Sequence, residues 1–379
     1  MKLFAVGPRE IHRFATVREF AEEFAPSSHD LIISIHPIWS AFVEPLSNGA
    51  HALLLDDYGN QEPTDGMIDK VIADATPYHA DRIIAIGGGA VMDVAKVVAI
   101  AAGRGIDEVI DGIADLKRST GLVLVPTTCG TGSETTEIAA INRTRLGTKA
   151  GISSPQMFAD HAVLIPELLH GLPDHVFATS SMDALVHSVE SVLSPNATPY
   201  TRLFGYEAMR MIVAGYQKVA DAGEAGSKER RARRNDLMED FLIASNYAGI
   251  SFDIAGCAAV HALSYQLGGK YHVAHGESNY AMFTGVLRCY MSIRSDGEIA
   301  VMNAFLAQIL GCGVNEVYDR LEALINRLLP KKALHEYGVT REDLPEFAHR
   351  VMTTQQRLMR NCFVPLDEEQ VLGIFETLY

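Results

Sequence analysis

The chain has 379 residues, of which 48% are hydrophobic and 21% charged, and it carries a formal net charge of −15 at pH 7. This composition is typical of globular proteins and excludes a disordered or collagen-like chain. The acidic balance argues against nucleic acid as a partner, because proteins that bind a phosphate backbone usually present a basic face. With about 100–200 residues expected per domain, the length predicts two domains.

The five cysteines are scattered along the chain at Cys129, Cys257, Cys289, Cys312 and Cys362. An odd number without a Cys-x-x-Cys pair indicates reduced thiols and argues against a disulfide framework or a cysteine-type zinc site. The N-terminus shows no signal-peptide pattern, and no apolar run reaches the roughly 18–20 residues needed to span a bilayer. We therefore expect a cytoplasmic protein with no membrane partner.

Short apolar runs alternate with helical patterns over the first part of the chain. The expected strands are residues 30–35, 52–55, 82–86 and 122–125, and the expected helices are residues 66–75 and 90–102. Continuous apolar strands that alternate with helices indicate a parallel sheet with helices on both faces. We predict an α/β nucleotide-binding domain over residues 1–166.

The pattern changes after residue 166, where strand-like runs become scarce. Stretches with a helical period follow at residues 174–193, 199–222, 231–252, 255–268, 298–310, 315–329, 341–357 and 367–378. This periodicity predicts an all-α domain over residues 167–379. The basic run at residues 228–234 is expected to be a solvated loop and helix start, with an anion site as the alternative.

A glycine-rich turn, Gly87-Gly88-Gly89, joins an expected strand to an expected helix. Glycines there let the backbone approach a diphosphate at the helix N-terminus. Because Met92 stands at the third glycine position of the dinucleotide pattern, the turn supports phosphate binding without proving it. A tight turn without a ligand is the alternative. In the first turns of the following helix, Asp93 is a candidate cofactor-binding residue and Lys96 is expected to face the surface.

A second donor-rich loop, residues 126–134, also follows a strand. Its candidate cofactor-binding hydroxyls belong to Thr127, Thr128, Thr131 and Ser133. Hydroxyl and amide donors suit phosphate and ribose, although helix capping by Thr131 or Ser133 is a second explanation. Open α/β sheets bind ligands where such loops follow parallel strands, so the two loops together predict a nucleotide site.

Four residues in the second half form a candidate set of metal ligands: Asp183, His187, His261 and His275. A single histidine in an apolar helix is more often a hydrogen-bonded core residue. Asp183 favours coordination, because a carboxylate in an apolar helix is costly to bury unless it is paired or bound to a cation, and His187 lies one turn away on the same face. Oxygen and nitrogen ligands suit Fe²⁺ or Zn²⁺.

If the nucleotide and metal sites serve one cleft, their combined chemistry is hydride transfer. A nicotinamide would accept hydride from an alcohol carbon while the metal polarises the alcohol oxygen. His272, three residues before His275, is expected to contact the metal ligands or the substrate and not to bind the metal.

Several of these motifs together resemble the iron-containing (group III) alcohol dehydrogenases. The matching stretches are residues 87–96, 126–134, 183–187, 261–264 and 275–276. The resemblance implies a dehydroquinate synthase-like architecture with the metal between the two domains, NAD as cofactor, and a homodimer. It also implies that Asp183, His187, His261 and His275 are the ligands, and that Lys149 contacts the cofactor ribose.

Within that family, residues 125–134, 194–201, 245–250 and 261–265 resemble the members that act on 4-hydroxybutyrate. That implies reversible, NAD-linked interconversion of 4-hydroxybutyrate and succinate semialdehyde. The acidic pair Asp56-Asp57 also favours NAD over NADP.

The sequence departs from the family at Tyr265, where many members have a histidine that is a candidate proton relay. Tyr265 is expected to line the pocket or to relay a proton through its hydroxyl, with His272 as the alternative relay. A carboxylated substrate needs a cationic anchor, for which Lys270, Arg357 and Arg360 are candidates, although each is expected to be a solvated surface residue.

Three other functions remain open at this point. One is a dehydrogenase of the same family acting on another short-chain alcohol or diol. The second is a metal-dependent lyase like dehydroquinate synthase, which would produce no net NADH. The third is a non-catalytic nucleotide-binding regulator, which an intact set of four metal ligands disfavours.

Overall fold

The structure is a computed structural model that describes residues 7–59, 62–146 and 148–379, without the side chains of residues 148–150. The chain divides into two compact units, one that ends at Gly171 and one that runs from Leu172 to Tyr379. Within the described residues, no single helix is long and apolar enough to cross a membrane. Two sharply bent helix pairs, residues 238–271 and 298–326, meet the length and composition criteria only in combination.

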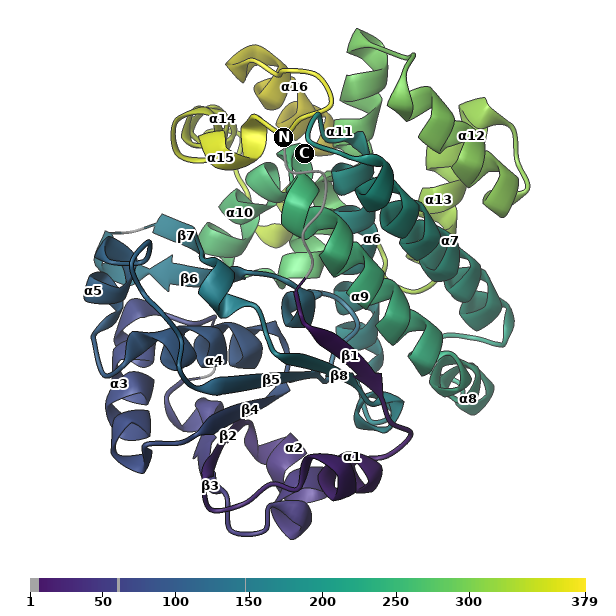
Figure 1. Cartoon of the computed structure of the whole chain (residues 1–379). Coiled ribbons are helices and arrows are strands. Elements are labelled where there is room, and N and C mark those ends of the chain that lie inside the picture. The colour runs from purple at the N-terminus through teal and green to yellow at the C-terminus, as the bar shows by residue number, and fades with distance from the viewer. Residues whose placement is uncertain (1–6, 60–61, 147) are drawn as a thin grey trace. The chain divides into compact units, whose positions relative to one another are not determined.

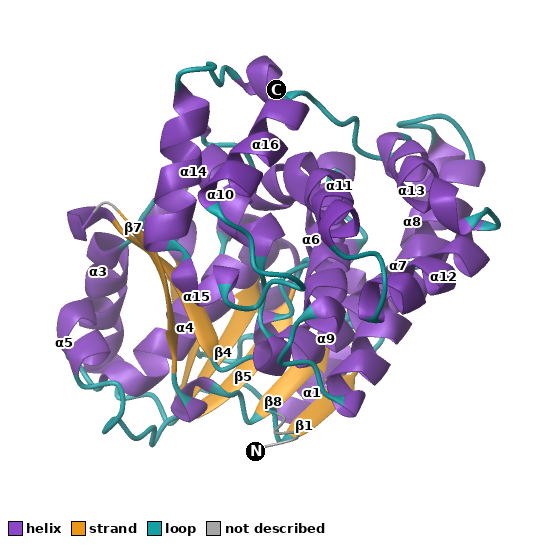
Figure 2. Ribbon diagram, turned by 90° about the horizontal axis from the view of Figure 1, so that it is seen from above, coloured by secondary structure: helices purple, strands orange, loops and turns teal. Residues whose placement is uncertain are grey.

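The first unit is built on a six-stranded sheet with the order β1-β8-β5-β4-β2-β3, whose strands are labelled in Figure 1. Figure 2 shows β4, β5, β8 and β1 of this sheet from above. All neighbouring strands in it are parallel. The strands are β1 (Glu10–Arg13), β2 (Asp30–Ser34), β3 (His51–Leu54), β4 (Arg82–Gly87), β5 (Gly121–Pro126) and β8 (His161–Leu164). Two further strands, β6 (Ile138–Arg143) and β7 (Thr148–Ser153), form a separate antiparallel pair.

The central strands are apolar and almost completely buried, as expected for a sheet covered on both faces. The helices of this unit are α1 (Val17–Phe24), α2 (His36–Ile38), α3 (Asp65–Ala75), α4 (Gly89–Ala101) and α5 (Ile106–Asp111). Figure 1 shows α4 on one face of the sheet and α1 and α2 on the other. The predicted parallel α/β architecture and its four strands are confirmed, whereas β1, β6, β7 and β8 were not predicted.

The strand order changes direction beside β2. This strand pairs with β3 on one side and with β4 on the other, so the chain crosses over between them. Ligands of open α/β sheets bind at the carboxyl ends of the strands at such a crossover. Gly88 and Gly89 follow the carboxyl end of β4, which places the glycine-rich turn at this position.

The second unit is helical, with the bounds α6 (Asp174–Leu193), α7 (Pro199–Asp221), α8 (Lys228–Asp236), α9 (Met238–Ala255), α10 (Ala259–Tyr271), α11 (His275–Ile293), α12 (Glu298–Leu310), α13 (Val317–Asn326), α14 (Asp343–Thr354), α15 (Gln356–Met359) and α16 (Glu368–Leu378). Residues 181–193 of α6 are all buried, and α6 packs against α7, α9 and α11. Functional side chains carried by α6 are therefore held in the centre of this unit.

The helical unit differs from the predictions in three respects. Residues 231–252 form parts of two helices, because the chain leaves helical geometry at Leu237 (φ −105°, ψ 4°), between the arginine-rich α8 and the apolar α9. Arg230 and Arg234 of α8 are buried, so this basic run is not simply a solvated segment. Helix α11 was not predicted at all, because its first turns bury polar residues such as Ser278 and Asn279 and show no apolar stripe.

Candidate active site

Helix α6 presents three ionisable side chains on successive turns of one face: Asp183, His187 and Glu190. Residues separated by three or four positions lie above one another on a helix. All three are buried in the helical unit. A buried cluster of this kind is unfavourable unless its members are paired with each other or with a cation, so the face of α6 marks a functional site.

Three imidazoles converge on one carboxylate oxygen of this face. The Oδ1 atom of Asp183 lies 3.5 Å from the Nε2 atoms of both His261 and His275, and 3.8 Å from that of His187. The potential ligand atoms of Asp183, His261 and His275 all lie within 4.8 Å of one another. The structure thus brings together the four residues proposed from the sequence, although His187 lies outside this closest group.

The position of His275 depends on the glycine that follows it. A Cβ atom on Gly276 would lie 1.8 Å from the backbone oxygen of Thr179, so only glycine lets the start of α11 approach α6 this closely. His275, at the first position of α11, thereby reaches Asp183. Its side chain is 30% exposed, whereas those of Asp183 and His261 are buried, so a substrate can approach the group from the His275 side.

Glu190 fixes the orientation of His261. Its Oε2 atom lies 2.6 Å from Nδ1 of His261 and accepts the backbone N–H of Ala258 at 2.9 Å, while Oε1 accepts the N–H of Val260 at 2.6 Å. The carboxylate therefore caps the start of α10 and occupies one ring nitrogen of His261. Because Nδ1 is engaged, Nε2 is the atom that His261 offers to a metal, an arrangement common around metal-binding histidines.

Asn279 lies one turn beyond His275 on α11 and reaches the same atoms. Its Nδ2 donates to Oδ1 of Asp183 at 2.8 Å and lies 3.3 Å and 3.4 Å from the Nε2 atoms of His261 and His275. Its Oδ1 atom is buried and has no hydrogen-bond partner among the described residues. The amide nitrogen of Asn279 thus lies within 3.4 Å of each of the three candidate ligand atoms, from Asp183, His261 and His275.

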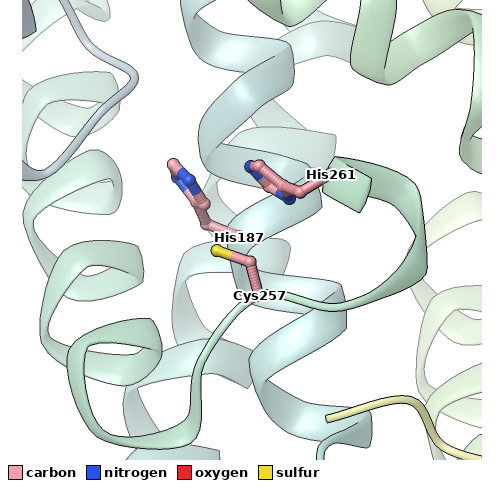
Figure 3. A group of neighbouring side chains, drawn as sticks. All are labelled: His187, Cys257 and His261. Carbon is pink, nitrogen blue, oxygen red and sulfur yellow. The ribbon is translucent and has the colours of Figure 1, made fainter. Parts of the chain in front are cut away.

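His187 belongs to a second, overlapping group. His187, Cys257 and His261 have potential ligand atoms within 4.8 Å of one another (Figure 3). The ring of His187 stacks between those of Phe252, at a centroid distance of 4.1 Å, and His261, at 4.7 Å. Cys257 lies in the short connection between α9 and α10, and no motif in the sequence distinguishes it from the other scattered cysteines.

Electrostatic coupling shifts the ionisation of these groups. Burial would raise the pKa of Asp183, but the neighbouring His187, His275 and His261 outweigh it and hold that pKa below its ordinary value. Burial would likewise lower the pKa of His187, and Asp183 and Cys257 raise it above normal. Burial would raise the pKa of the Cys257 thiol, yet His261 and His187 lower it to about 7. The pocket therefore stabilises a carboxylate and a thiolate.

The two candidate relay residues have different surroundings. Tyr265 is half-buried one turn beyond His261, with its ring centroid 5.9 Å from that of His275. His272 is exposed and caps α10 in a left-handed conformation (φ 55°), where its N–H donates to Gly268 O. Among the candidate substrate anchors, Lys270 bonds to Asp343, and Arg357 and Arg360 are exposed.

In the α/β unit, the glycine-rich turn packs directly against the second loop. A Cβ atom on Gly89 would lie 2.7 Å from Cγ2 of Thr131, and one on Gly87 would lie 2.5 Å from Cγ2 of Val91. Glycine is thus required at both positions for close packing. Gly88, Gly89, Thr128 and Thr131 remain partly accessible, and they are the residues of the two loops best placed to meet a ligand.

Lys96 does not face the surface, contrary to the prediction. Its side chain is 0% exposed, and its Nζ donates to Ser133 Oγ at 2.7 Å, Thr136 Oγ1 at 2.9 Å and Ile138 O at 2.8 Å. Sequence reasoning failed here because the acceptors lie about 40 residues away on the second loop and β6. The lysine connects α4 to that loop.

Asp93 completes this connection. Its Oδ1 accepts the Ser133 hydroxyl at 2.6 Å, and its Oδ2 accepts the backbone N–H of Ala140 at 2.9 Å. Asp93 and Ser133 therefore hold the second loop in place, and Thr127 is buried with its N–H donating to Gly87 O. The backbone of Lys149 lies in β7 opposite Asn142, while its side chain lies outside the described part of the structure.

Both units match models of one protein family. A model for iron-containing alcohol dehydrogenases matches residues 11–166, and a model for the C-terminal part of the Fe-containing alcohol dehydrogenase family matches residues 177–379. The chain belongs to the iron-containing alcohol dehydrogenase family. The resemblance seen in the sequence is thereby confirmed.

Individual members of the family are similar over the whole chain. The 4-hydroxybutyrate dehydrogenase of Clostridium kluyveri is 41% identical over 379 residues, 100% of both chains. The sulfoacetaldehyde reductase of Bilophila wadsworthia is 30% identical over 335 residues, 83% of this chain and 81% of the relative. The structure of sulfoacetaldehyde reductase from Bifidobacterium kashiwanohense in complex with NAD⁺ has a TM-score of 0.83 at 21% identity, covering 100% of this chain and 99% of that one.

The donor set fits the metal that an iron-containing dehydrogenase requires. One carboxylate oxygen and two imidazole nitrogens, from Asp183, His261 and His275, converge in a buried pocket with one accessible side. Such oxygen and nitrogen ligands suit Fe²⁺ and Zn²⁺. Glu190 and Asn279, which the sequence analysis missed, both contact this group: Glu190 orients His261, and Asn279 donates to Asp183. Glu190 could have been found by the argument applied to Asp183, since it is a second carboxylate on the same apolar helix face.

Proposed function

We propose that the protein is a metal-dependent, NAD-linked dehydrogenase that reversibly oxidises 4-hydroxybutyrate to succinate semialdehyde. The observation that carries the proposal is the convergence of Asp183, His261 and His275 in a chain that aligns over its full length with a 4-hydroxybutyrate dehydrogenase. We assign nucleotide binding to residues 1–166 and metal and substrate binding to residues 167–379.

The ligands in this proposal are Asp183, His187, His261 and His275, with Fe²⁺ as the metal and Zn²⁺ as the alternative. His187 joins the set because its Nε2 lies 3.8 Å from the same oxygen of Asp183. A divalent cation held there supplies Lewis acidity to an alcohol or carbonyl oxygen. Glu190 keeps Nε2 of His261 available, and the buried side chains around Asp183 exclude water from the reacting carbon.

The cofactor in this proposal is NAD, bound by the two loops of the α/β unit. The N-terminus of α4, with Gly88 and Gly89, offers backbone N–H groups to the diphosphate. Further contacts come from the remaining candidate residues Gly87, Asp93, Thr127, Thr128, Thr131, Ser133 and Lys149. The carboxylates of Asp56 and Asp57, at the end of β3, would repel a 2′-phosphate and so favour NAD over NADP.

Proton transfer is assigned to Tyr265, with His272 as the alternative. Tyr265 is supported by its half-buried position beside His275, whereas His272 is exposed. Replacing Tyr265 with Phe should lower kcat about 100-fold, the lower end of the range for losing a general acid or base. The matched variant His272→Asn should leave kcat unchanged if Tyr265 is the relay; the reverse result would transfer the role to His272.

The free cysteines support a cytoplasmic location. The family resemblance supports a homodimer that acts on a small hydroxy acid and its aldehyde. The relatives named for 4-hydroxybutyrate and sulfoacetaldehyde both point to an aldehyde that carries an acidic group. A dehydrogenase of the same family that acts on another short-chain alcohol or diol is the second candidate, and a dehydroquinate synthase-like lyase is a more distant one.

A substrate panel tests the proposal. Purified protein reconstituted separately with Fe²⁺ and Zn²⁺ is assayed for NADH formation from 4-hydroxybutyrate, 2-sulfoethanol, ethanol and 1,3-propanediol, with NAD⁺ and NADP⁺. We expect the highest kcat/KM with 4-hydroxybutyrate and NAD⁺, and no activity after chelation or in Asp183→Asn. Preference for another alcohol would replace the substrate assignment, and turnover after complete metal removal would contradict the metal-dependent mechanism.

A further inference from the structure

The helical unit contains a thiolate-type group of potential metal ligands next to the oxygen-type group. His187 of α6, Cys257 of the connection between α9 and α10, and His261 of α10 approach one another within 4.8 Å (Figure 3). In the picture, the sulfur of Cys257 points toward the two imidazole rings. Asp183 and His275 do not belong to this group, and among the residues that the structure describes no carboxylate does.

The backbone around Cys257 is held in place from both sides. Gly256 ends α9 with a positive φ of 80°, and a Cβ atom there would lie 2.4 Å from Nδ2 of Asn361. That same Nδ2 donates to the carbonyl of Cys257 at 2.9 Å, and the N–H of Ala258 donates to Glu190 at 2.9 Å. The thiol is thus directed at the two histidines by fixed neighbours on each side.

The two imidazoles are also held in fixed orientations. His187 is stacked between Phe252, with an interplanar angle of 20°, and His261, with an angle of 12°. His261 is held through Nδ1 by Glu190 at 2.6 Å. A preorganised pair of imidazoles and a thiol, each with its orientation set by packing or hydrogen bonds, has the properties of a built coordination site.

The chemistry of this group differs from that of the neighbouring one. One thiolate and two imidazoles form a Cys-His₂ set, whose sulfur and nitrogen ligands are of the kinds that zinc binds, and it leaves the fourth position of a tetrahedral site open. Thiolates favour Zn²⁺ and other soft cations, whereas a carboxylate with imidazoles also suits Fe²⁺. The cation that binds therefore decides which group is filled.

The two groups compete, because both need the same nitrogen. Glu190 occupies Nδ1 of His261, so only Nε2 is available for coordination, and that atom also faces Asp183 at 3.5 Å. One ring nitrogen serves one cation at a time. The helical unit can consequently hold one ion in either position but not two.

We propose that Cys257, His187 and His261 form a second metal site, which favours Zn²⁺ and similar thiophilic cations over Fe²⁺ and, when filled, excludes an ion held by Asp183 and His275. This inference shares two histidines with the proposed function but does not depend on the substrate or on turnover. Its failure would leave the oxidoreductase assignment unchanged, because the two are tested by different measurements.

X-ray absorption at the zinc edge tests the proposal. Metal-free full-length protein is loaded with one equivalent of Zn²⁺, and the nearest-neighbour shells are measured without substrate or cofactor. We expect a sulfur neighbour at about 2.3 Å beside nitrogen neighbours at about 2.0–2.1 Å. A wild-type spectrum without a sulfur neighbour would overturn the proposal whatever the variants show.

Two cysteine variants complete the experiment. Cys257→Ser replaces the sulfur with an oxygen of similar size and should remove the sulfur neighbour and weaken zinc binding at least about 10-fold. Cys312→Ser, near the connection of α12 and α13, should keep both. Persistence of the sulfur neighbour in Cys257→Ser would overturn the assignment to Cys257.

Discussion

The carboxylate of Glu190 lies 2.6 Å from Nδ1 of His261 and at the same time accepts two backbone N–H groups at the start of α10. The contact between Glu190 and His261 joins α6 to α10 at the centre of the candidate metal site. This contact determines which ring nitrogen of His261 carries the proton and in which direction the imidazole points. In a histidine without such a partner, neither property is fixed.

Replacing Glu190 with Ala should therefore weaken metal binding by about 10–100-fold, as is typical when the partner of a metal-binding histidine is lost. Metal titration of the stripped protein measures this effect. Glu190→Gln should bind more tightly than Glu190→Ala, because its amide oxygen can still accept one hydrogen bond. The control Glu346→Ala, exposed on α14, should bind as the wild type does; an unchanged affinity in Glu190→Ala would contradict the orienting role.

Lys96 gives a second prediction, on the α/β unit. Its buried ammonium donates to Ser133, Thr136 and Ile138, and Lys96→Met would leave those acceptors without this donor. Breaking a buried charged network typically costs about 3–5 kcal/mol. We expect a loss of that size in denaturant unfolding and weaker NAD⁺ binding, because the second loop is released from α4. Lys70→Met, exposed on α3, should change neither; a stable variant with normal NAD⁺ affinity would contradict this role.

The parts of the fold that the sequence predicted are those governed by local pattern. A window of about ten residues is enough to recognise the apolar runs of β2, β4 and β5 and the helical period of α6 and α12. The split of residues 231–252 at Leu237 and the existence of α11 depend on which faces are buried by distant elements. Helix α11 buries Ser278 and Asn279 against partners that no local window contains.

In the candidate site, too, contacts within one helix could be predicted from the sequence, whereas contacts between distant elements could not. Asp183 and His187 are one turn apart on one helix, so their pairing could be read from spacing, whereas the approach of Cys257 to His187 is a tertiary contact between a connection and α6. Lys96 was assigned to the surface because lysine usually lies there. Its burial is explained by acceptors that lie about 40 residues further along the chain, at Ser133, Thr136 and Ile138.

The pairing of Asp160 with Arg118 predicts a pH dependence of stability. Arg118 donates to both oxygens of Asp160, at 2.7 Å and 3.1 Å, and the N–H of Leu122 donates at 2.9 Å. Burial would raise the pKa of Asp160, but these bonds outweigh it and hold that pKa below its ordinary value. The ionised form is therefore favoured in the folded state and stabilises it above the unfolded pKa of about 3.9.

Asp160→Asn should destabilise the protein by about 1.5–3 kcal/mol at pH 7, the usual value for hydrogen bonds to a charged group. The difference from wild type should shrink as the pH falls below about 4, because the wild-type carboxyl then becomes protonated. Urea unfolding measures this difference in stability at several pH values over an interval of about 4 units, from pH 3 to pH 7. Asp111→Asn, exposed on α5, should show no such trend; a difference that is constant with pH would contradict the ionic origin.

Asn279 competes with a metal ion for the same atoms. Its Nδ2 donates to Asp183 at 2.8 Å and lies within 3.4 Å of the Nε2 atoms of His261 and His275. A cation coordinated by those three atoms would have to displace these contacts. The amide is therefore expected to stabilise the protein without metal more than the protein with metal.

Asn279→Ala should accordingly lower the stability of the metal-free protein by about 1–3 kcal/mol, or a few degrees in Tm, while the metal-loaded protein loses less. By linkage, the thermal shift produced by added metal should be larger than in wild type, and the apparent metal affinity should rise up to about 10-fold. Asn303→Ala, another buried amide on α12, is the matched control: it should lower Tm without changing the metal-induced shift. A smaller metal-induced shift in Asn279→Ala than in wild type would mean that the amide supports the coordinated ligands, because its loss would then destabilise the metal-loaded protein more than the metal-free one.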